Sequence, residues 1–202
     1  MAGRAMNVRA SWAATLLLGA LVAGCHRAPD PATAPLAGAA IGGPFSLVDQ
    51  DGRLVTERAF AGRYRAIYFG YSYCPDVCPT TLQVLMEGFR RFAHAHPADA
   101  ARLVPIFVSV DPARDTPAVL KRYVAAFGPQ LVGLTGSADA IARTAKEYGV
   151  YYKAQPAKGA SGYLVDHMSQ AMLFSPDNKP IALLPTDQGA DAVAATFSDW
   201  VR

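Results

Sequence analysis

The chain lacks any cluster of lysine and arginine and carries little net charge of either sign. Its 202 residues include 19 basic and 16 acidic side chains, for a formal net charge of +3. Arg4 and Arg9 fall within the first 24 positions, so the remainder holds 17 basic against 16 acidic side chains, a net charge of +1. A chain this close to neutral produces no long-range field that attracts a polyanion, and we expect no nucleic acid partner.

The apolar run near the N-terminus, residues 12–21, is too short to span a bilayer comfortably. It follows Arg4 and Arg9 and ends in small residues before Cys25, which is typical of a bacterial lipoprotein signal. We therefore expect residues 1–24 to be a signal peptide and Cys25 to be lipidated. The protein is then anchored to a membrane through lipid, on the periplasmic side of the cell envelope. The alternative is an uncleaved transmembrane anchor followed by an idle cysteine.

Large apolar side chains are scarce between residues 25 and 41, where proline, alanine and glycine predominate. Such a segment cannot bury enough surface to fold, so we expect a flexible tether. The remaining residues, 42–202, number about 160, which suffices for one domain with an ample core, and they contain no internal repeat.

Apolar runs and turn residues alternate along this domain. Strands are expected at 44–48 and near 54–55 as an N-terminal hairpin, then at 65–70, 103–110, 131–134, 150–153, 170–174 and 180–184. Helices are expected from Pro79 to Ala95, after Thr116 to about Phe127, from Ser137 to Tyr148 and from Gly189. This order predicts an α/β, thioredoxin-like fold, with a mixed central sheet and helices on both of its faces.

Only three cysteines are present, and Cys25 is accounted for by lipidation. Cys74 and Cys78 lie four positions apart between a strand and a helix, where they can form a disulfide or bind one soft metal ion together. Pro75 disfavours helical geometry at Cys74, which leaves Cys78 at the helix start. Because a helix N-terminus favours a thiolate, we expect Cys78 to be the more acidic thiol. Paired thiolates select Cu(I), whereas a structural zinc site needs four ligands.

Histidine is also scarce, with four in the chain. His26 adjoins the lipidation site, and His94 and His96 lie at a helix end, where they can simply complement the helix dipole. His167 stands in an irregular segment leading into a strand, about ninety positions after the cysteines. It is the one further candidate ligand, although an ordinary structural or surface histidine fits the pattern as well.

Three segments together resemble the Sco/SenC family. They are GYSYCPDVCP at residues 70–79, VSVDPARDTP at 108–117 and the pair Asp166 and His167, and the segment GPFSLVDQDG at 43–52 is similar to the opening strand and turn of that family. The resemblance implies a thioredoxin-like domain that binds one copper, as Cu(I) or Cu(II), through Cys74, Cys78 and His167. It also implies a role in assembling the binuclear copper centre of cytochrome c oxidase, with the oxidase's copper-bearing subunit as partner.

Other residues in these segments have less specific roles. Asp76 between the thiols either steers copper, hydrogen-bonds a partner or is a turn residue, and Asp111 at a strand end is expected near the site. Asp115 and Thr116 are expected to be helix caps. Met168 stands where the family commonly has a small hydroxyl residue. With Met172 it is a weak extra copper donor or, as we expect, a packing residue.

Four functions fit these features. The first is a copper-delivery protein. The second is a thiol-disulfide oxidoreductase that uses Cys74 and Cys78 as a redox dithiol on the oxidase's copper-ligand cysteines. A peroxidase-like relative and a copper or redox sensor are weaker readings. Since a disulfide between Cys74 and Cys78 would block metal loading, we expect a periplasmic thiol reductant and a copper donor as further partners.

Overall fold

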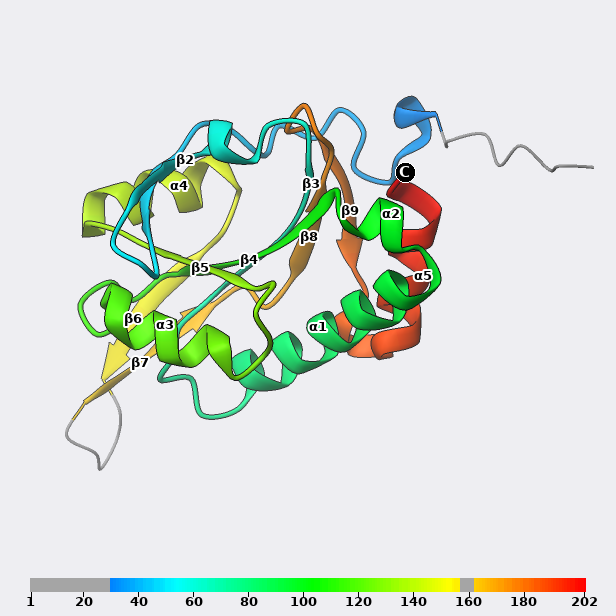
Figure 1. Ribbon diagram of the computed structural model, residues 1–202. Coiled ribbons are helices and arrows are strands. Elements are labelled where there is room, and N and C mark those ends of the chain that lie inside the picture. Colours follow the sequence, from blue (N-terminus) through cyan, green and yellow to red (C-terminus); the bar gives the residue numbers. More distant parts are fainter. Residues whose placement is uncertain (1–29, 157–161) are drawn as a thin grey trace, which may run out of the picture.

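The computed structural model describes residues 30–156 and 162–202 (Figure 1). In this part of the chain the strands are β1 (Ser46–Asp49), β2 (Leu54–Thr56), β3 (Tyr64–Gly70), β4 (Leu103–Ser109), β5 (Val132–Thr135), β6 (Tyr152–Pro156), β7 (Tyr163–His167), β8 (Ala171–Phe174) and β9 (Pro180–Leu184). The α-helices are α1 (Val77–Ala95), α2 (Pro97–Ala100), α3 (Pro117–Ala125), α4 (Ala138–Glu147) and α5 (Ala190–Trp200). Short 3₁₀ turns are η1 (Pro31–Thr33), η2 (Glu57–Phe60) and η3 (Thr186–Gln188).

The described residues form a mixed sheet of seven strands in the order β2-β1-β5-β4-β3-β8-β9. The central strands β3, β4 and β5 run parallel, whereas β1 and β8 pair antiparallel to this core. All seven residues of β4 are buried, as expected of a parallel strand covered on both faces. The sheet, its N-terminal hairpin and the final β8–β9 hairpin confirm the predicted fold.

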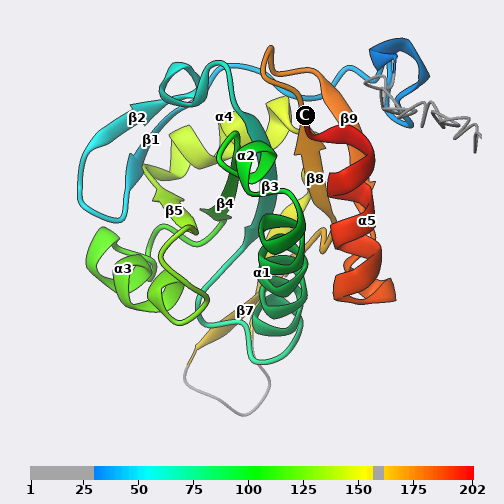
Figure 2. The ribbon, with the colours of Figure 1, turned by 45° about the vertical axis from the view of Figure 1, so that its right-hand side comes forward.

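Helices cover both faces of the sheet (Figure 2). On one face α3 packs over β5, where a Cβ built on Gly133 would lie 2.9 Å from Val124 of α3. On the other face a Cβ on Gly136 would meet Leu47 of β1 and Ala140 of α4. Helix α1 runs beside α5 in Figures 1 and 2, and Phe92 and Phe197 meet there with ring centroids 5.7 Å apart.

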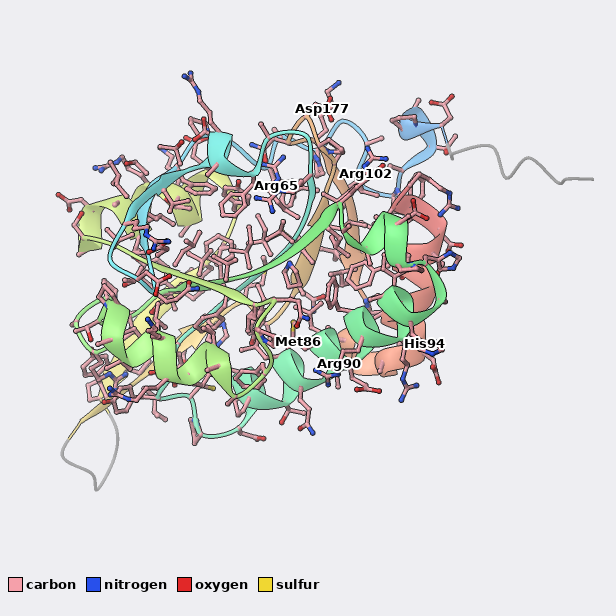
Figure 3. All side chains as sticks on the ribbon, viewed as in Figure 1. Arg65, Met86, Arg90, His94, Arg102 and Asp177 are labelled. Carbon is pink, nitrogen blue, oxygen red and sulfur yellow. The ribbon has the colours of Figure 1, made fainter. Side chains whose placement is uncertain are left out.

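The side chains of α1 divide as its hydrophobic pattern predicts. Leu82, Leu85, Phe89 and Phe92 are buried. Met86 is fully buried as well, whereas Arg90 and His94 are exposed (Figure 3). One face of α1 is therefore committed to the core, which fixes the orientation of its N-terminal turn.

Three predictions about elements are wrong. Helix α1 begins at Val77 rather than Pro79, because the first turn of a helix has free N–H groups and a proline fits anywhere within it. Strand β6 begins at Tyr152, within the strand expected at 150–153, and continues to Pro156, into the polar residues 154–162 that were expected as a loop before the next strand. It pairs with β7 in a ribbon separate from the main sheet. His167, expected in an irregular segment, is the last residue of β7.

The end of the expected tether nearest the domain also differs from the prediction, because its backbone is hydrogen-bonded to the domain. The Leu36 N–H donates to the Ile181 carbonyl at 2.9 Å, and the Gly42 N–H donates to the Glu147 carbonyl at 2.8 Å. Residues 30–41 thus lie against β9 and α4, since backbone hydrogen bonds need no large apolar side chains. The expected signal peptide, Cys25 and His26 lie outside the described residues. Among the described helices, none combines the length and apolar character needed to cross a membrane.

Candidate metal centre

The two cysteines lie where a buried strand passes into α1. Cys78 is the second residue of α1 and is fully buried, while Cys74 lies in the preceding loop and is partly exposed. The Cys78 N–H points to the Cys74 sulfur at 3.4 Å. Both cysteines are free thiols. The first turn of α1 therefore places both sulfurs on one side of the loop, as the position of Pro75 predicts.

His167 reaches this pair from the end of β7. Its Nε2 lies 3.1 Å from the Cys78 sulfur, although the two residues are 89 positions apart. The ligand atoms of Cys74, Cys78 and His167 all lie within 4.8 Å of one another. Within residues 30–156 and 162–202 this is the group of cysteine, histidine and acidic side chains close enough to hold a metal ion.

The second nitrogen of the His167 ring determines what Nε2 can do. Nδ1 lies 3.0 Å from the Met168 carbonyl oxygen, which can only accept a hydrogen bond. Nδ1 therefore carries the proton, and Nε2 presents its lone pair to the Cys78 thiol. Burial lowers the pKa of His167 below its ordinary value, which keeps the ring neutral at physiological pH. A neutral, oriented imidazole is the form that binds a metal.

The two thiols differ in acidity in the opposite sense to our prediction. Burial raises the pKa of Cys78 to about 12, because desolvation outweighs the helix N-terminus. Burial also opposes ionisation of Cys74, but the backbone N–H groups of Asp76, Cys78 and Val77 outweigh it and lower the pKa of that thiol. Cys74 is thus the more acidic and more accessible sulfur, and the expectation for Cys78 is wrong.

Aromatic rings enclose the histidine. Tyr68 and Tyr71 meet the His167 ring edge-on, with centroids 6.1 Å and 5.8 Å away. Gly70 leaves room for the buried sulfur, because a Cβ at that position would lie 2.9 Å from Cys78 Sγ and 3.0 Å from Phe107. The strand residues before the cysteines therefore shape a tight, largely apolar wall behind the sulfurs.

Asp115 holds the thiol loop in place rather than capping a helix, so that prediction is wrong. It is fully buried, and its carboxylate accepts hydrogen bonds from the Ser72 N–H at 3.0 Å and from the Ser109 hydroxyl at 2.5 Å. The Ser72 hydroxyl also donates to it. Thr116 does cap α3, accepting from the Val119 N–H at 3.3 Å. A buried carboxylate needs such partners, but the sequence alone does not say from which loop they come.

The remaining candidates lie outside the metal-ligand cluster. Asp76 is exposed and precedes α1 without a side-chain capping bond. Asp111 is buried, and its carboxylate accepts from Arg114 and from the Tyr163 hydroxyl. Met172 is fully buried in β8 and Met168 packs against the core, as expected of packing residues.

Sequence reasoning did not single out Tyr68, Tyr71, Arg114 or Tyr163. The first three stand in or beside the segments that carry the family resemblance, which is the one signal that could have found them. Tyr163 directly follows the polar residues 154–162, and no sequence signal marks its contact with Asp111.

Comparison with known proteins places this geometry among close relatives. The family model described as SCO1/SenC matches residues 33–202. A curated relative, Protein SCO2 homolog, mitochondrial, of Bos taurus, is 44% identical over 146 residues, covering 72% of this chain and 54% of that protein. Protein SCO1, mitochondrial, of Saccharomyces cerevisiae is 40% identical over 140 residues, covering 69% and 46%. The chain spans about half the length of the curated relatives it matches.

Solved structures agree on the fold. The structure titled Bradyrhizobium japonicum ScoI with copper bound is 39% identical, with a TM-score of 0.72, and the match covers 80% of this chain and all of that one. Arabidopsis thaliana ScoI with copper bound is 38% identical, with a TM-score of 0.73 and coverage of 78% and 95%.

Proposed function

The chain belongs to the SCO1/SenC family, and we propose that it is a membrane-anchored, copper-binding chaperone that delivers copper to the binuclear copper centre of cytochrome c oxidase during assembly. The observation that carries this proposal is the convergence of Cys74, Cys78 and His167 within 4.8 Å. The relatives solved with copper bound support copper as the cargo.

The donor set fits copper chemically. Two thiolates and one imidazole suit Cu(I), and Cu(II) takes a further oxygen donor such as water. One copper is held per chain. Cys74, partly exposed and the more acidic thiol, is the ligand that an incoming thiolate of the oxidase subunit reaches first. Copper then transfers by ligand exchange, one sulfur at a time, with buried Cys78 released last.

We propose that residues 1–24 are a signal peptide and that Cys25 carries the lipid anchor on the periplasmic side of the cell envelope. A copper donor and a thiol reductant act there as further partners. The curated relatives are mitochondrial by name, so compartment is tested directly. Cys25→Ser should move the protein from the membrane fraction to the soluble fraction, and retention in the membrane fraction contradicts the lipid anchor.

A binding titration of the reduced protein tests the copper site. Wild type should bind one copper per chain, whether it is supplied as Cu(I) or as Cu(II). His167→Ala should weaken Cu(II) binding more than Cu(I) binding, since the remaining donors are both soft thiolates. His94→Ala, a matched change at an exposed histidine, should behave as wild type. Unchanged affinity for both oxidation states in the His167 variant would remove His167 from the site.

A second candidate is a thiol-disulfide oxidoreductase that reduces the oxidase subunit's copper-ligand cysteines. The lowered pKa and partial exposure of Cys74 favour it, because both increase the availability of the nucleophilic thiolate. In that reaction Cys74 attacks the partner's disulfide, Cys78 resolves the mixed disulfide, and the two thiols give up two electrons to become a disulfide. The two functions separate with His167→Ala, which should impair copper delivery but leave disulfide reduction by the dithiol intact.

A further inference from the structure

Arg114 lies between the thiol loop and the strand that carries His167. Its guanidinium carbon is 3.8 Å from the centroid of the Tyr163 ring, at the start of β7. The same carbon lies 5.0 Å from the ring of Tyr73 and 5.6 Å from the ring of Tyr71. Tyr73 directly precedes Cys74 in the loop, and Tyr71 lies three positions before it. One cation thus contacts both segments that supply the donor atoms.

Hydrogen bonds also join Arg114, Asp111 and Tyr163 to one another. Arg114 Nε donates to Asp111 Oδ2, and Arg114 Nη1 donates to the Tyr163 carbonyl at 2.9 Å. The Tyr163 hydroxyl donates to Asp111 Oδ1 at 2.5 Å. Asp111 is buried two residues beyond the end of β4, next to Val110, whose N–H donates to the Gly70 carbonyl of β3 at 2.8 Å, so the guanidinium is held against the central strands. The planar fork of arginine makes both bonds while its face stacks on the rings, which a lysine ammonium cannot do.

Side-chain contacts, including that of buried Val165 in β7, hold the β6–β7 ribbon to the rest of the domain. Among the described residues, β6 and β7 pair with each other and share no ladder with the seven-stranded sheet. Tyr163 and His167 are the first and last residues of β7 and lie on the same face, because their separation is even. Fixing Tyr163 in place therefore determines where His167, at the other end of β7, lies relative to the thiols.

We propose that Arg114 is a positioning residue that fastens the β6–β7 ribbon to the thiol loop and so holds His167 at the cysteine pair. The role in metal retention rests on the proposed copper site, whereas the fastening of the ribbon does not. Residues that orient metal ligands from the outside typically change metal affinity by about 10–100-fold when replaced.

Arg114→Gln in the reduced full-length protein tests this. Without copper, hydrogen exchange of the β7 amides should accelerate about tenfold or more, while exchange in β4 and α5 stays as in wild type. With copper, release of Cu(II) to a chelator should accelerate by about 10-fold or more. Adding His167→Ala to Arg114→Gln should produce little further loss, because both changes remove the same ligand from the metal.

Two variants serve as references. Arg122→Gln removes an exposed arginine from α3 and should leave exchange and release unchanged. Arg114→Lys keeps the charge beside Asp111 but loses the fork and the stacking, and it should resemble Arg114→Gln. Full recovery in the lysine variant would mean that charge alone acts, and it overturns the proposal.

Wild-type β7 exchange and wild-type copper release in Arg114→Gln also overturn it. If exchange rises everywhere in that variant, Tyr163→Phe decides, since it keeps the ring and removes only the hydroxyl bond to Asp111. A rise confined to the ribbon then supports the proposal, and its absence overturns it. If wild type binds no copper, the proposed function fails, and β7 exchange in the metal-free protein still decides whether Arg114 fastens the ribbon.

Discussion

At the scale of single residues, the members of the cluster of Cys74, Cys78 and His167 could be predicted, but the acidity of its thiols could not. The types and spacing of Cys74 and Cys78 mark them as soft donors, and the family resemblance adds His167. Which thiol ionises first depends on how deeply each sulfur is buried, and this follows from packing against Gly70 and Phe107. The helix N-terminus is visible in sequence, whereas the desolvation that outweighs it at Cys78 is not.

The raised pKa of Cys78 predicts an alkaline loss of stability in the reduced, metal-free protein. The folded state keeps this proton until about pH 12, whereas the unfolded chain releases it near its ordinary value of 9.0. Between these values the unfolded state binds fewer protons, so the free energy of unfolding falls as pH rises, by up to about 1.4 kcal/mol per pH unit.

Urea unfolding between pH 8 and pH 10.5 with excess reductant measures this slope, and Cys78→Ala should flatten it relative to wild type. Cys74→Ala is the control, because the Cys74 thiol affects the slope of the unfolding free energy against pH in the opposite direction. A thiol with a lowered folded pKa stabilises the protein above its unfolded pKa, and this contribution is lost as pH falls through the folded pKa. Parallel curves for wild type and Cys78→Ala would contradict the burial argument.

At the scale of elements, helix-capping residues and apolar runs in the sequence predict the helices and central strands. Thr116 and Ser137 cap α3 and α4, and the apolar runs of β3 and β4 form the centre of the sheet. The β6–β7 ribbon could not be predicted, because most of its side chains are partly or fully exposed and give no apolar pattern. Its pairing, with Tyr152 opposite His167, joins segments that only the folded chain brings together.

The contact between α1 and α5 predicts a destabilising Gly88→Ala substitution. A Cβ at Gly88 would lie 2.6 Å from Val193 Cγ1 and 3.0 Å from the Ala190 carbonyl oxygen. Alanine improves helix propensity by about 1 kcal/mol, but overpacking against a fully buried residue costs about 1–3 kcal/mol, so the free energy of unfolding should fall. Thermal or urea unfolding measures the change.

Val193→Ala supplies the matched background. It removes the methyl group at 2.6 Å but leaves the Cβ of residue 193, which would lie 2.7 Å from the new Cβ. Adding Gly88→Ala there should therefore cost less than it does in wild type, and the difference is the coupling energy between positions 88 and 193. A higher melting temperature for Gly88→Ala in the wild-type background would show that the helices move apart freely.

At the scale of the whole molecule, copper and a disulfide should stabilise different parts of the protein. At the proposed site, copper would join α1 to the end of β7 across 89 positions, whereas a Cys74–Cys78 disulfide would close a loop of five residues and leave His167 unattached. At a thousandfold excess over the dissociation constant, bound copper contributes about 4 kcal/mol, which corresponds to an increase in Tm of about 8–16 °C. The short disulfide loop contributes about 2 kcal/mol by loop entropy.

Thermal unfolding combined with hydrogen exchange distinguishes the two forms. Cu(I)-loaded protein should melt highest and show slower exchange in β7, because the imidazole is tied to the sulfurs. Oxidised protein should bind no Cu(I) and should exchange in β7 as the reduced, metal-free form does, since its bond lies wholly within the thiol loop. Slower β7 exchange on oxidation alone would mean that disulfide formation itself stabilises the β6–β7 ribbon. The oxidation state of the thiols, rather than the metal, would then control how tightly the ribbon packs on the domain.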